Sequence, residues 1–488
     1  MTDRERILVI GADAAGMSAA HQALRLGRAQ GRDLDVLALE ATEYTSYSAC
    51  GLPYWVAGTV GDYDELVARS PEEHRAMGVD LRTGTRATRL DLDRHEVEFV
   101  TAGGETGREG FDQVVIATGA VPILPAWTTR AGRQIDGVRA AKNVADAQGW
   151  IDRWAAHGAG AAGDDEGRNR VVVVGAGYIG LELAEAAQDH GFEVVLIARS
   201  RVMSNLDPEM SERITTKMAE TGVRVINGAT VGGLETDARG EVTALVTSVG
   251  QRIATRHVIV ATSIRPALDF LEGTGLERGP SGGLRPDPSG RLADGVFAAG
   301  DCIETRHRIS GEWVYLPLGT HANKQGRVVG TNLVGGREEF AGVLGTAITR
   351  FGSGDAVVEI SRTGLSLADA QRAGFDAAAL VTEGTTASGY MPEASPIAVN
   401  VIADRETRRL LGAQIVGGPR SAKRIDTMAA ALWGNMTVDD LAQMDLAYAP
   451  PFATVWEIVQ LAARRLGDRF SSSFRPPHTP SKGCGFDS

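Results

Sequence analysis

Short, uninterrupted apolar runs that end in glycine recur along the chain. Residues 7–10, Ile-Leu-Val-Ile, run directly into Gly11, and a segment with a helical pattern then separates them from a second apolar run at 36–39. A continuous apolar run of this length is typical of a buried strand in a parallel sheet. The same succession returns at 170–174 and 194–197. The pattern therefore predicts two α/β units, each built as strand, glycine turn, helix and strand.

The first glycine turn, Gly11-Ala12-Asp13-Ala14-Ala15-Gly16, resembles the G-x-G-x-x-G fingerprint, except that Asp13 stands at the middle glycine. Such a turn places a pyrophosphate at a helix N-terminus, where amide N–H groups and the helix dipole favour anions. The strand at 36–39 ends in Glu40, near the spacing expected for a carboxylate that binds a ribose hydroxyl. The turn thus predicts a dinucleotide site, and an ordinary βαβ turn is the simpler alternative.

The second turn, Gly175-Ala176-Gly177-Tyr178-Ile179-Gly180, has all three glycines. The strand after its helix ends in Ala-Arg199-Ser-Arg201 and carries no acid there. Arginines without a carboxylate suit a 2′-phosphate, although Arg199 and Arg201 could also be ordinary solvated charges. We therefore expect FAD at the first turn and NADPH at the second, with NADH possible.

Two further strand ends extend this pattern. The strand at 112–116 ends in Ala-Thr118-Gly119, and the strand at 295–299 ends in Gly-Asp301, whose carboxylate could accept a hydrogen bond from a flavin ribityl hydroxyl. Either could also be a plain strand terminus. The order of the four motifs indicates that one nucleotide-binding domain is inserted into another. The expected limits are 1–125 with 260–335 for the FAD domain and 140–259 for the NAD(P)H domain.

From about residue 340 the pattern predicts a third, α+β domain that ends near residue 470. Residues 158–169 are small and polar and predict a surface loop, and residues 471–488 have the composition of a flexible tail. The elements expected in the third domain are strands at 357–361, 397–402 and 410–415 and helices at 421–433 and 455–466.

Composition narrows the classes of partner. Lys and Arg total 50 against 62 for Asp and Glu, so the net charge is −12, which argues against attraction to nucleic acid or to anionic membranes. No apolar run approaches the roughly 20 residues that span a bilayer. The three cysteines, Cys50, Cys302 and Cys484, form neither a disulfide framework nor a metal-ligand spacing. We therefore expect a cytoplasmic protein without a bound metal.

Cys50 lies in a short Ser/Tyr/Gly segment with a recognisable pattern. Ser46-Tyr-Ser-Ala-Cys50 is similar to the motif Ser-Phe-x-x-Cys, with Tyr for Phe, and Gly-Leu-Pro-Tyr54 follows it. Together with Asp445-Leu-Ala-Tyr-Ala-Pro-Pro451 and the order of the nucleotide motifs, this resembles the FAD-dependent pyridine nucleotide–disulfide oxidoreductases over nearly the whole chain. The resemblance is strongest to the single-cysteine branch, which contains coenzyme A–disulfide reductases, NADH oxidases and peroxidases, and persulfide reductases.

The resemblance implies a redox role for Cys50 and a homodimer whose active site is shared across the interface. Electrons would pass from the nicotinamide through FAD to Cys50, whose thiolate exchanges with a substrate disulfide or persulfide. It also implies that Ser46 lies in the flavin site, that Tyr448 donates a proton to the leaving thiolate, and that Tyr390 assists. Both tyrosines could instead be core aromatics, and Met391 replaces the tyrosine that often follows Tyr390 in the family.

Three functions remain open at this point. The first is a reductase of coenzyme A disulfide, a persulfide or another low-molecular-weight thiol compound, with Arg25 as a substrate-binding candidate or simply a helix-end charge. The second is an NAD(P)H oxidase or peroxidase in which Cys50 cycles through a sulfenic acid. The third is a non-enzymatic flavin redox sensor. We expect Cys302 to be a buried core residue, and Cys484 to be a non-functional thiol of the tail or, less simply, a resolving thiol.

Overall fold

The computed structural model of the chain describes residues 4–156, 167, 169–352 and 354–471. The chain divides into two compact units, which are described separately. Residues 4–345 and 349–358 form the first unit, and residues 346–348 and 359 onward form the second. The predicted surface loop at 158–169 and the predicted tail at 471–488 fall largely outside the described residues.

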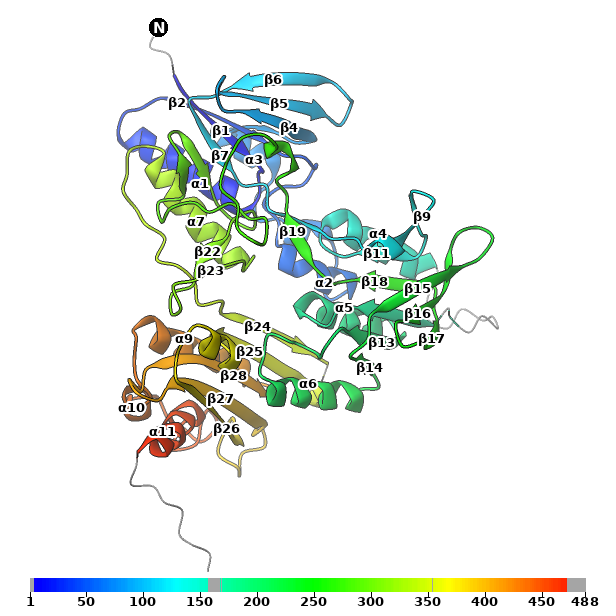
Figure 1. Ribbon diagram of the computed structural model, residues 1–488, viewed down its shortest axis with the longest axis vertical. Helices are drawn as coiled ribbons and strands as arrows, with labels where there is room; N and C mark the ends of the chain where they lie inside the picture. Colours follow the sequence, from blue (N-terminus) through cyan, green and yellow to red (C-terminus); the bar gives the residue numbers. More distant parts are fainter. Residues whose placement is uncertain (1–3, 157–166, 168, 353, 472–488) are drawn as a thin grey trace, which may run out of the picture. The chain divides into compact units, whose positions relative to one another are not determined.

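The first unit contains a six-stranded sheet in which β1 stands between β2 and β7 (Figure 1). All of its neighbouring strands are parallel except β20, which is antiparallel to β21. Ile7, Leu8 and Val9 of β1 are fully buried, which confirms the predicted buried strand. Across the sheet the strands are β20 (Arg291–Ala293), β21 (Val296–Ala298), β7 (Gln113–Ile116), β1 (Glu5–Ile10), β2 (Leu34–Leu39) and β3 (Asp80–Arg82).

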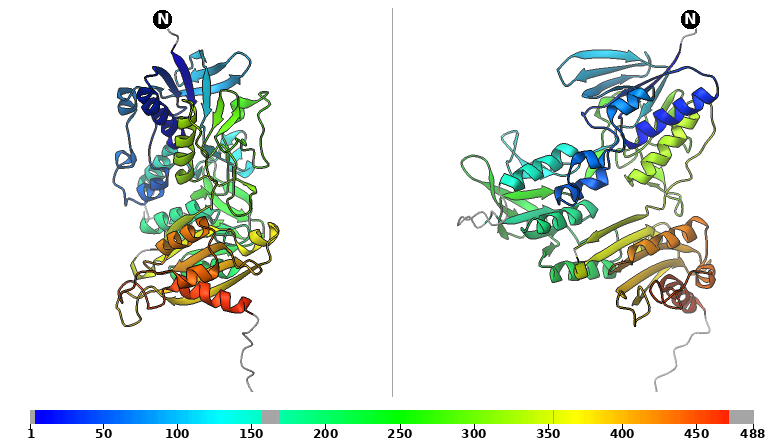
Figure 2. Two further views of the ribbon diagram at one scale, coloured as in Figure 1. Left: turned by 90° about the vertical axis from the view of Figure 1, so that its left-hand side faces the viewer. Right: turned by 180° about the vertical axis from the view of Figure 1, so that it is seen from behind.

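Helices α1 (Ala14–Ala29) and α7 (Gly319–Asn332) pack side by side and share one core with this sheet (Figures 1 and 2). Small residues make the close packing possible, because an added Cβ at Gly326 would lie 2.2 Å from the carbonyl oxygen of Ala15. Helix α7 thus holds α1 close against its own backbone, in the core that both helices share with the sheet.

The chain between β7 and β20 in the sequence forms a second sheet, whose strands are all parallel. This arrangement confirms that one nucleotide-binding fold is inserted in another, while the exact domain limits stay a prediction. Its strands are β11 (Val138–Ala140), β18 (His257–Val260), β12 (Arg170–Val174), β13 (Glu193–Ala198) and β14 (Arg224–Asn227), with helices α4 (Val144–Ala156), α5 (Tyr178–Asp189) and α6 (Pro208–Glu220).

Smaller elements complete the first unit. The antiparallel pair β8 (Ala120–Pro122) and β19 (Ile264–Pro266) lies where the chain leaves the first sheet and returns to it. Two short helices, α2 (Leu52–Val56) and α3 (Pro71–Ala76), follow the Cys50 motif. The remaining small sheets are β4 (Thr85–Asp91), β5 (Glu96–Thr101) and β6 (Thr106–Gly110); β15 (Val231–Thr236), β16 (Val242–Thr247) and β17 (Arg252–Ala254); β9 (Thr129–Arg130) with β10 (Arg133–Gln134); and β22 (Thr305–Arg306) with β23 (Trp313–Val314).

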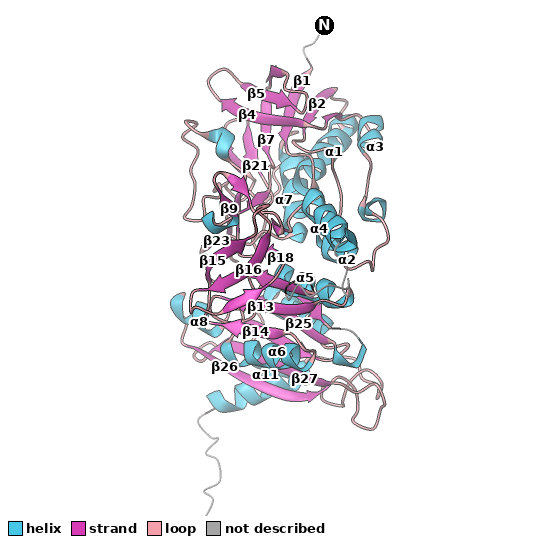
Figure 3. Ribbon diagram, turned by 90° about the vertical axis from the view of Figure 1, so that its right-hand side faces the viewer, coloured by secondary structure: helices cyan, strands magenta, loops and turns pink. Residues whose placement is uncertain are grey.

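The second unit is an antiparallel sheet with helices, as the sequence predicted for the third domain (Figure 3). Helix α11 packs against β26 and β27. The helix predicted at 455–466 is present and runs from Ile458 to Phe470. It begins later than predicted because the Glu457 side chain accepts a hydrogen bond from the Val459 N–H and caps its N-terminus. The elements of this unit are β25 (Val358–Gly364, apart from its first residue), β26 (Ala377–Thr385), β27 (Pro396–Asp404), β28 (Leu410–Gly417), α8 (Leu367–Arg372), α9 (Ile425–Trp433), α10 (Val438–Gln443) and α11 (Ile458–Phe470). Strand β24 (Ala347–Phe351) has residues 347 and 348 in this unit and residues 349–351 in the first unit.

Among the described residues, no helix combines the length and the apolar character that crossing a lipid bilayer requires.

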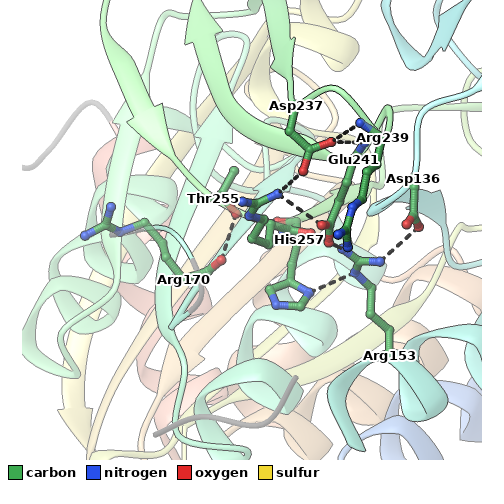
Figure 4. Close-up of polar contacts among 9 residues, drawn as sticks. Asp136, Arg153, Arg170, Asp237, Arg239, Glu241, Thr255 and His257 are labelled. Carbon is green, nitrogen blue, oxygen red and sulfur yellow. Dashed lines mark hydrogen bonds and ion pairs between the residues drawn. The ribbon is translucent and has the colours of Figure 1, made fainter. Parts of the chain in front are cut away.

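An ion-pair network holds α4 to the strands around it (Figure 4). Arg153 on α4 pairs with Asp136 and Glu241 and also donates to the Arg256 carbonyl and to His257 Nδ1. Arg256 in turn pairs with Glu241, so that two guanidinium groups share one carboxylate. The Arg153 side chain is only 12% exposed, and a partly buried pair is costly to break from one side.

We expect Arg153→Met to destabilise the first unit by about 2–3 kcal/mol, because Glu241 would lose a charge partner in a desolvated position. Arg170→Met is the matched control, because Arg170 pairs with Glu193, whose side chain is 62% exposed, and should cost less than about 1 kcal/mol. Thermal unfolding of both variants measures the difference. Equal destabilisation would contradict a special role for the Arg153 network.

The glycines of the second turn have different steric surroundings. An added Cβ at Gly180 would lie 1.9 Å from the Gly175 carbonyl oxygen, whereas Gly177 has no heavy atom within 4 Å of that position. Gly175 has φ +114°, a region that side chains rarely adopt, and its Cβ would lie 2.2 Å from the Ala261 carbonyl oxygen. Gly175 and Gly180 are therefore required by the fold, while Gly177 leaves open space in front of the turn.

This difference predicts opposite outcomes for two alanine substitutions. Gly180→Ala should lower the unfolding midpoint strongly, because neither backbone segment can move away without breaking the turn. Gly177→Ala should leave the midpoint within about 2 °C of wild type, because the methyl group meets no protein atom. If the predicted dinucleotide site is correct, the methyl group of Gly177→Ala should instead weaken NAD(P)H binding, which titration calorimetry measures. A strong loss of stability in Gly177→Ala would show that this position is packed.

Candidate functional site

The first candidate site lies at the carboxyl edge of the six-stranded sheet. The chain leaves β1 toward α1 and β2 on one side, while β7 pairs with β1 on the other, so β1 marks a topological switch point. Ligands of open parallel sheets bind at such points, beyond the carboxyl ends of the strands. The parallel order brings the ends of these strands to the same edge. The predicted FAD residues at this edge are Gly11, Ala12, Ala15, Gly16, Glu40, Thr118, Gly119 and Asp301.

The turn after β1 has the geometry of a pyrophosphate-binding turn. Gly11 has φ +97°, and an added Cβ there would lie 2.3 Å from the Ala117 carbonyl oxygen, so only glycine fits. The turn opens into α1, whose first N–H groups have no partner within the helix. The buried hydroxyl oxygen of Thr118 has no hydrogen-bond partner, and an orphaned polar atom at a strand end fits a bound group. These residues fit FAD.

Glu40, which directly follows the neighbouring strand β2, is hydrogen-bonded to the backbone of the first glycine turn. Its carboxylate accepts hydrogen bonds from the Ala12 N–H at 2.9 Å and from the N–H and hydroxyl of Thr42, both at 2.9 Å. The predicted ribose-binding carboxylate is therefore fixed in orientation by the backbone of the fingerprint itself. This placement agrees with the hypothesis, and the role of Glu40 stays a prediction.

Asp13 occupies the middle position of the fingerprint and caps α1 without a side-chain capping bond. Burial, followed by the charge of Glu40, raises the pKa of its carboxyl group to about 6, and Asp301 adds to the effect. Lys142 is a positive charge that opposes this shift. The site thus gathers three carboxyl groups around one lysine.

Lys142 was not identified from the sequence. Its ammonium lies 3.5 Å from the Asp301 carboxylate, and the Tyr315 hydroxyl donates to the Asp301 backbone carbonyl at 3.0 Å. Asp301 is therefore contacted at its carboxylate by Lys142, which lies just before α4, and at its backbone carbonyl by the phenol of Tyr315. No motif in the sequence connects position 142 to position 301, since only the tertiary fold brings them together.

The second candidate site lies at the carboxyl edge of the inserted sheet, where β12 pairs with β13 and β18. Gly177 leaves space there for a phosphate to approach the backbone, and Tyr178 and Ile179 are half-buried in the first turn of α5. Arg199 is exposed at the end of β13, as a side chain that reads a 2′-phosphate must be. Arg201 differs, because its guanidinium donates to the carbonyls of Ser204 and Leu206 and so organises the following loop.

Cys50 lies in the turn Ala49–Gly51, directly before α2, and α2 packs against both α4 and α5 of the inserted fold. The residue is solvent-exposed. Partial desolvation of the thiol raises its pKa, Glu182 and Asp301 raise it further, and Lys142 lowers it. The thiol thus stands where charged groups of both nucleotide-binding folds meet.

Glu182, on α5, is the second residue that the sequence did not reveal. Burial raises the pKa of its carboxyl group to about 7, although the Thr349 hydroxyl donates to it at 2.9 Å and favours the ionised form. Its neighbour Glu185 accepts from the Gly352 N–H at 2.8 Å. Burial thus favours the protonated form of Glu182, and the charge of its ionised form raises the pKa of Cys50. Its position two residues after the last fingerprint glycine is the signal that could have found it.

Ser46 begins the loop that leads to Cys50. It has φ +48°, which is uncommon for a residue with a side chain. Its carbonyl accepts from the Ala68 N–H at 2.8 Å, and its hydroxyl lies 2.8 Å from Nε2 of the buried His74. The structure thus fixes Ser46 through the protein itself, and its predicted place in the flavin site stays a prediction.

Tyr390 and Tyr448 lie on two adjoining loops of the second unit. The Ser388 N–H donates to the Pro450 carbonyl at 2.9 Å, and the Ser388 hydroxyl donates to the Ala453 carbonyl at 3.3 Å. Tyr390 is 75% exposed and Tyr448 is 47% exposed, so neither is a core aromatic within this chain. The same loops expose other large apolar side chains, namely Phe452, Val455 and Trp456.

Two further predictions concern residues outside these groups. Cys302 is fully buried, with its thiol directed to the carbonyls of Ile116 and Ala299, which confirms it as a core residue. Arg25 is exposed on α1, and its guanidinium donates to Gln22, so it is accessible to a ligand. Cys484 lies outside the described residues.

Two family models match the chain. One is described as pyridine nucleotide-disulphide oxidoreductase and covers residues 5–326, and the other is described as the dimerisation domain of the same family and covers residues 356–459. The chain is 34% identical over 470 residues to the NAD(P)H coenzyme A polysulfide/persulfide reductase of Pyrococcus horikoshii, which covers 95% of this chain and 98% of that protein.

Solved structures agree with this relationship. The NAD-dependent persulfide reductase of A. fulgidus superposes with a TM-score of 0.87 at 33% identity, covering 95% of this chain and 83% of that one. An engineered water-forming NADPH oxidase, derived from the Lactobacillus brevis enzyme and bound to NADPH, has a TM-score of 0.86 at 28% identity, covering 95% and 99%. The chain belongs to the pyridine nucleotide–disulphide oxidoreductase family, as its motifs predicted, and it is an oxidoreductase that uses FAD and NAD(P)H.

Proposed function

We propose that this enzyme transfers electrons from NADPH through FAD to Cys50 and on to a low-molecular-weight disulfide or persulfide, such as a coenzyme A disulfide. The position of Cys50 carries the proposal. It is an exposed thiol in a turn between the two nucleotide-binding folds, and the other cysteine that the structure describes, Cys302, is buried and remote from solvent. A single sulfur is sufficient when the substrate thiol provides the other half of the redox pair.

The bound cofactors would supply two electrons and a proton as hydride. The chain's own residues would then direct the sulfur chemistry. The Cys50 thiolate attacks one sulfur of the substrate, the substrate S–S bond breaks, and the second sulfur leaves as a thiolate that takes up a proton. Two electrons then reduce the mixed disulfide, which releases the second thiol and restores Cys50. Lys142 favours the thiolate form of Cys50, while Glu182 opposes it when ionised.

Tyr448 is the proposed proton donor to the leaving thiolate, with Tyr390 as its neighbour. Both are exposed on adjoining loops with Phe452, Val455 and Trp456, a surface that a second copy of the chain would cover. The match to a dimerisation domain supports a homodimer, in which these tyrosines reach Cys50 of the partner subunit. Arg25 is the proposed contact for a substrate phosphate, because it is exposed and cationic.

An NAD(P)H oxidase or peroxidase is the second candidate, because the engineered oxidase has nearly the same TM-score as the persulfide reductase. Cys50 would then cycle through a sulfenic acid. The redox-sensor hypothesis is not proposed, since the chain belongs to an enzyme family. We also propose the cytoplasm as its location, because a chain of 488 residues with three cysteines suits a reducing compartment.

The proposed preference for NADPH depends on Arg199. The engineered NADPH oxidase acquired alanine, arginine and serine at three consecutive positions, and residues 198–200 of this chain are the same triplet. Arg199 is exposed, whereas Arg201 already donates to two loop carbonyls. We therefore assign the main contact with the 2′-phosphate to Arg199.

Replacing Cys50 by serine tests the proposed function. We expect NADPH to reduce the flavin of Cys50→Ser at a normal rate, while anaerobic turnover of coenzyme A disulfide and of a persulfide falls at least about 10³-fold, because serine is neither a thiolate nor redox-active at neutral pH. Cys302→Ala and Cys484→Ser are the controls and should keep their turnover. Near wild-type turnover in Cys50→Ser would show that the catalytic sulfur is elsewhere, and turnover with peroxide or oxygen alone would favour the second candidate.

Replacing Arg199 by alanine tests the cofactor preference. Arg199→Ala should weaken NADPH binding roughly 10- to 100-fold, because a charge-assisted hydrogen bond contributes about 1.5–3 kcal/mol, and should leave NADH binding nearly unchanged. Arg224→Ala removes the same charge from the exposed start of the neighbouring strand β14 and serves as control. Dissociation constants for both nucleotides decide the matter, and equal losses for NADPH and NADH would contradict phosphate recognition by Arg199.

A further inference from the structure

Three polar side chains form a hydrogen-bonded chain beside the loop that carries Cys50. His21 Nε2, on α1, lies 2.7 Å from His74 Nδ1, on α3, and His74 Nε2 lies 2.8 Å from the hydroxyl of Ser46. The two imidazole rings meet edge to edge, with centroids 4.9 Å apart and an angle of 24° between the ring planes, which suits an in-plane hydrogen bond between the facing nitrogens. His74 is fully buried. Neither histidine belongs to a motif that the proposed reaction uses.

The contact between the two rings limits the number of protons that the pair can hold. One of the two facing nitrogens must carry a hydrogen and the other must accept it. A pair with one extra proton can still form this bond. A pair with two extra protons would place N–H against N–H, so the closed arrangement holds at most one extra proton, whereas two solvated histidines hold two in acid.

Burial and the neighbouring charges also disfavour protonation of the neutral histidine pair. Burial lowers the pKa of His74 to about 4, and the charges of His21 and Arg69 lower it further, while Glu73 on the same helix acts in the opposite direction. Burial also lowers the pKa of His21, with Arg69 and then Arg28 as additional causes. The pair is therefore neutral at pH 7.

The series of hydrogen-bonded side chains ends at Ser46, a residue with an uncommon backbone conformation that begins the Cys50 loop. Ser46 has φ +48°, and the loop is tied to the segment 66–68 by the bond from Ala68 N–H to the Ser46 carbonyl and the bond from Ser48 N–H to the Leu66 carbonyl, each 2.8 Å. The Ser46 hydroxyl is the point at which a side chain from outside this ladder, His74, reaches the loop. Cys50 follows four residues later.

We propose that His21 and His74 form a proton-sensitive brace that positions the Cys50 loop through Ser46. His74 is the positioning residue, because it contacts the loop and not the reacting atoms. Above pH 6.5 the neutral pair is closed and Ser46 is held. As the pH falls from 6.5 toward 4, the two histidines bind more protons when they are separated than when they are hydrogen-bonded to each other, so acid favours the open arrangement and the brace opens. The consequence for catalysis rests on the proposed function, in which Cys50 is the reacting sulfur.

Hydrogen–deuterium exchange of the holoenzyme, followed by mass spectrometry, tests the brace directly. After correction for the intrinsic pH dependence of exchange, protection of the peptide at 45–52 should fall between pH 7 and pH 5, by up to about tenfold per pH unit for each proton taken up. The buried strand β12 is the internal reference and should not change. Protection at 45–52 that is independent of pH in the wild type would overturn the proposal.

Glutamine variants separate titration from packing, because an amide keeps a donor and an acceptor but does not ionise in this range. The double variant His21→Gln/His74→Gln should show no pH-dependent loss of protection at 45–52. His21 is the half-buried outer member of the hydrogen-bonded series. The single variant His21→Gln should lose protection less steeply with falling pH than wild type, and it provides the test if the double variant does not fold. His95→Asn is the histidine control and should keep the wild-type slope. A wild-type slope in either glutamine variant would overturn the brace.

Turnover of the same proteins links the brace to the reaction. In anaerobic assays with NADPH and coenzyme A disulfide, the wild-type kcat should decline more steeply between pH 7 and pH 5 than the kcat of the double variant, with flavin reduction by NADPH unchanged. Parallel profiles would show that the brace does not position Cys50 for catalysis. Absence of turnover in the wild type on every sulfur substrate would count against the proposed function, and the exchange slopes would then decide the brace alone.

Discussion

An added methyl group at Gly16 or Gly180 would lie 1.9 Å from the carbonyl oxygen of the glycine that opens the same turn, and the rest of the site depends on this constraint. The close approach lets each helix begin directly above the carboxyl end of its strand. The helix N-termini and the strand ends then meet at one edge of each sheet, where the parallel order also places Glu40 and Asp301 or Arg199. The two proposed cofactor sites thus depend on two backbone contacts that only glycine allows.

Motifs that lie within one short stretch of chain could be predicted from the sequence, because their chemistry is local. The two glycine turns, the buried strands before them and the turn that carries Cys50 depend on neighbouring residues, and the structure contains each of them. Lys142, Glu182 and His74 could not be predicted in the same way. Each acts on a residue far away in the sequence, and packing of α4, α5 or α3 against another element creates the contact.

The two described cysteines show how strongly the environment decides the chemistry of one side chain. Cys302 is fully buried, its thiol faces two backbone carbonyls, and burial raises its pKa, so it behaves as a small apolar residue. Cys50 is exposed at the start of a helix and feels charges from three separate elements. The fold places a sulfur in both positions, but only the second has solvent access and a nearby cation.

The charges around the first fingerprint also indicate how it would hold the anion of the proposed FAD site. Asp13, Glu40 and Asp301 gather there, and Lys142 is already paired with Asp301. In this cluster side-chain charge is net negative, so the attraction for the pyrophosphate of the proposed FAD site would come from the backbone N–H groups and the dipole of α1. The raised pKa of Asp13, about 6, fits this arrangement. A nearby anion would raise that pKa further, because it disfavours the ionised carboxylate, and a protonated Asp13 would then be a hydrogen-bond donor at the position where most fingerprints have only a glycine.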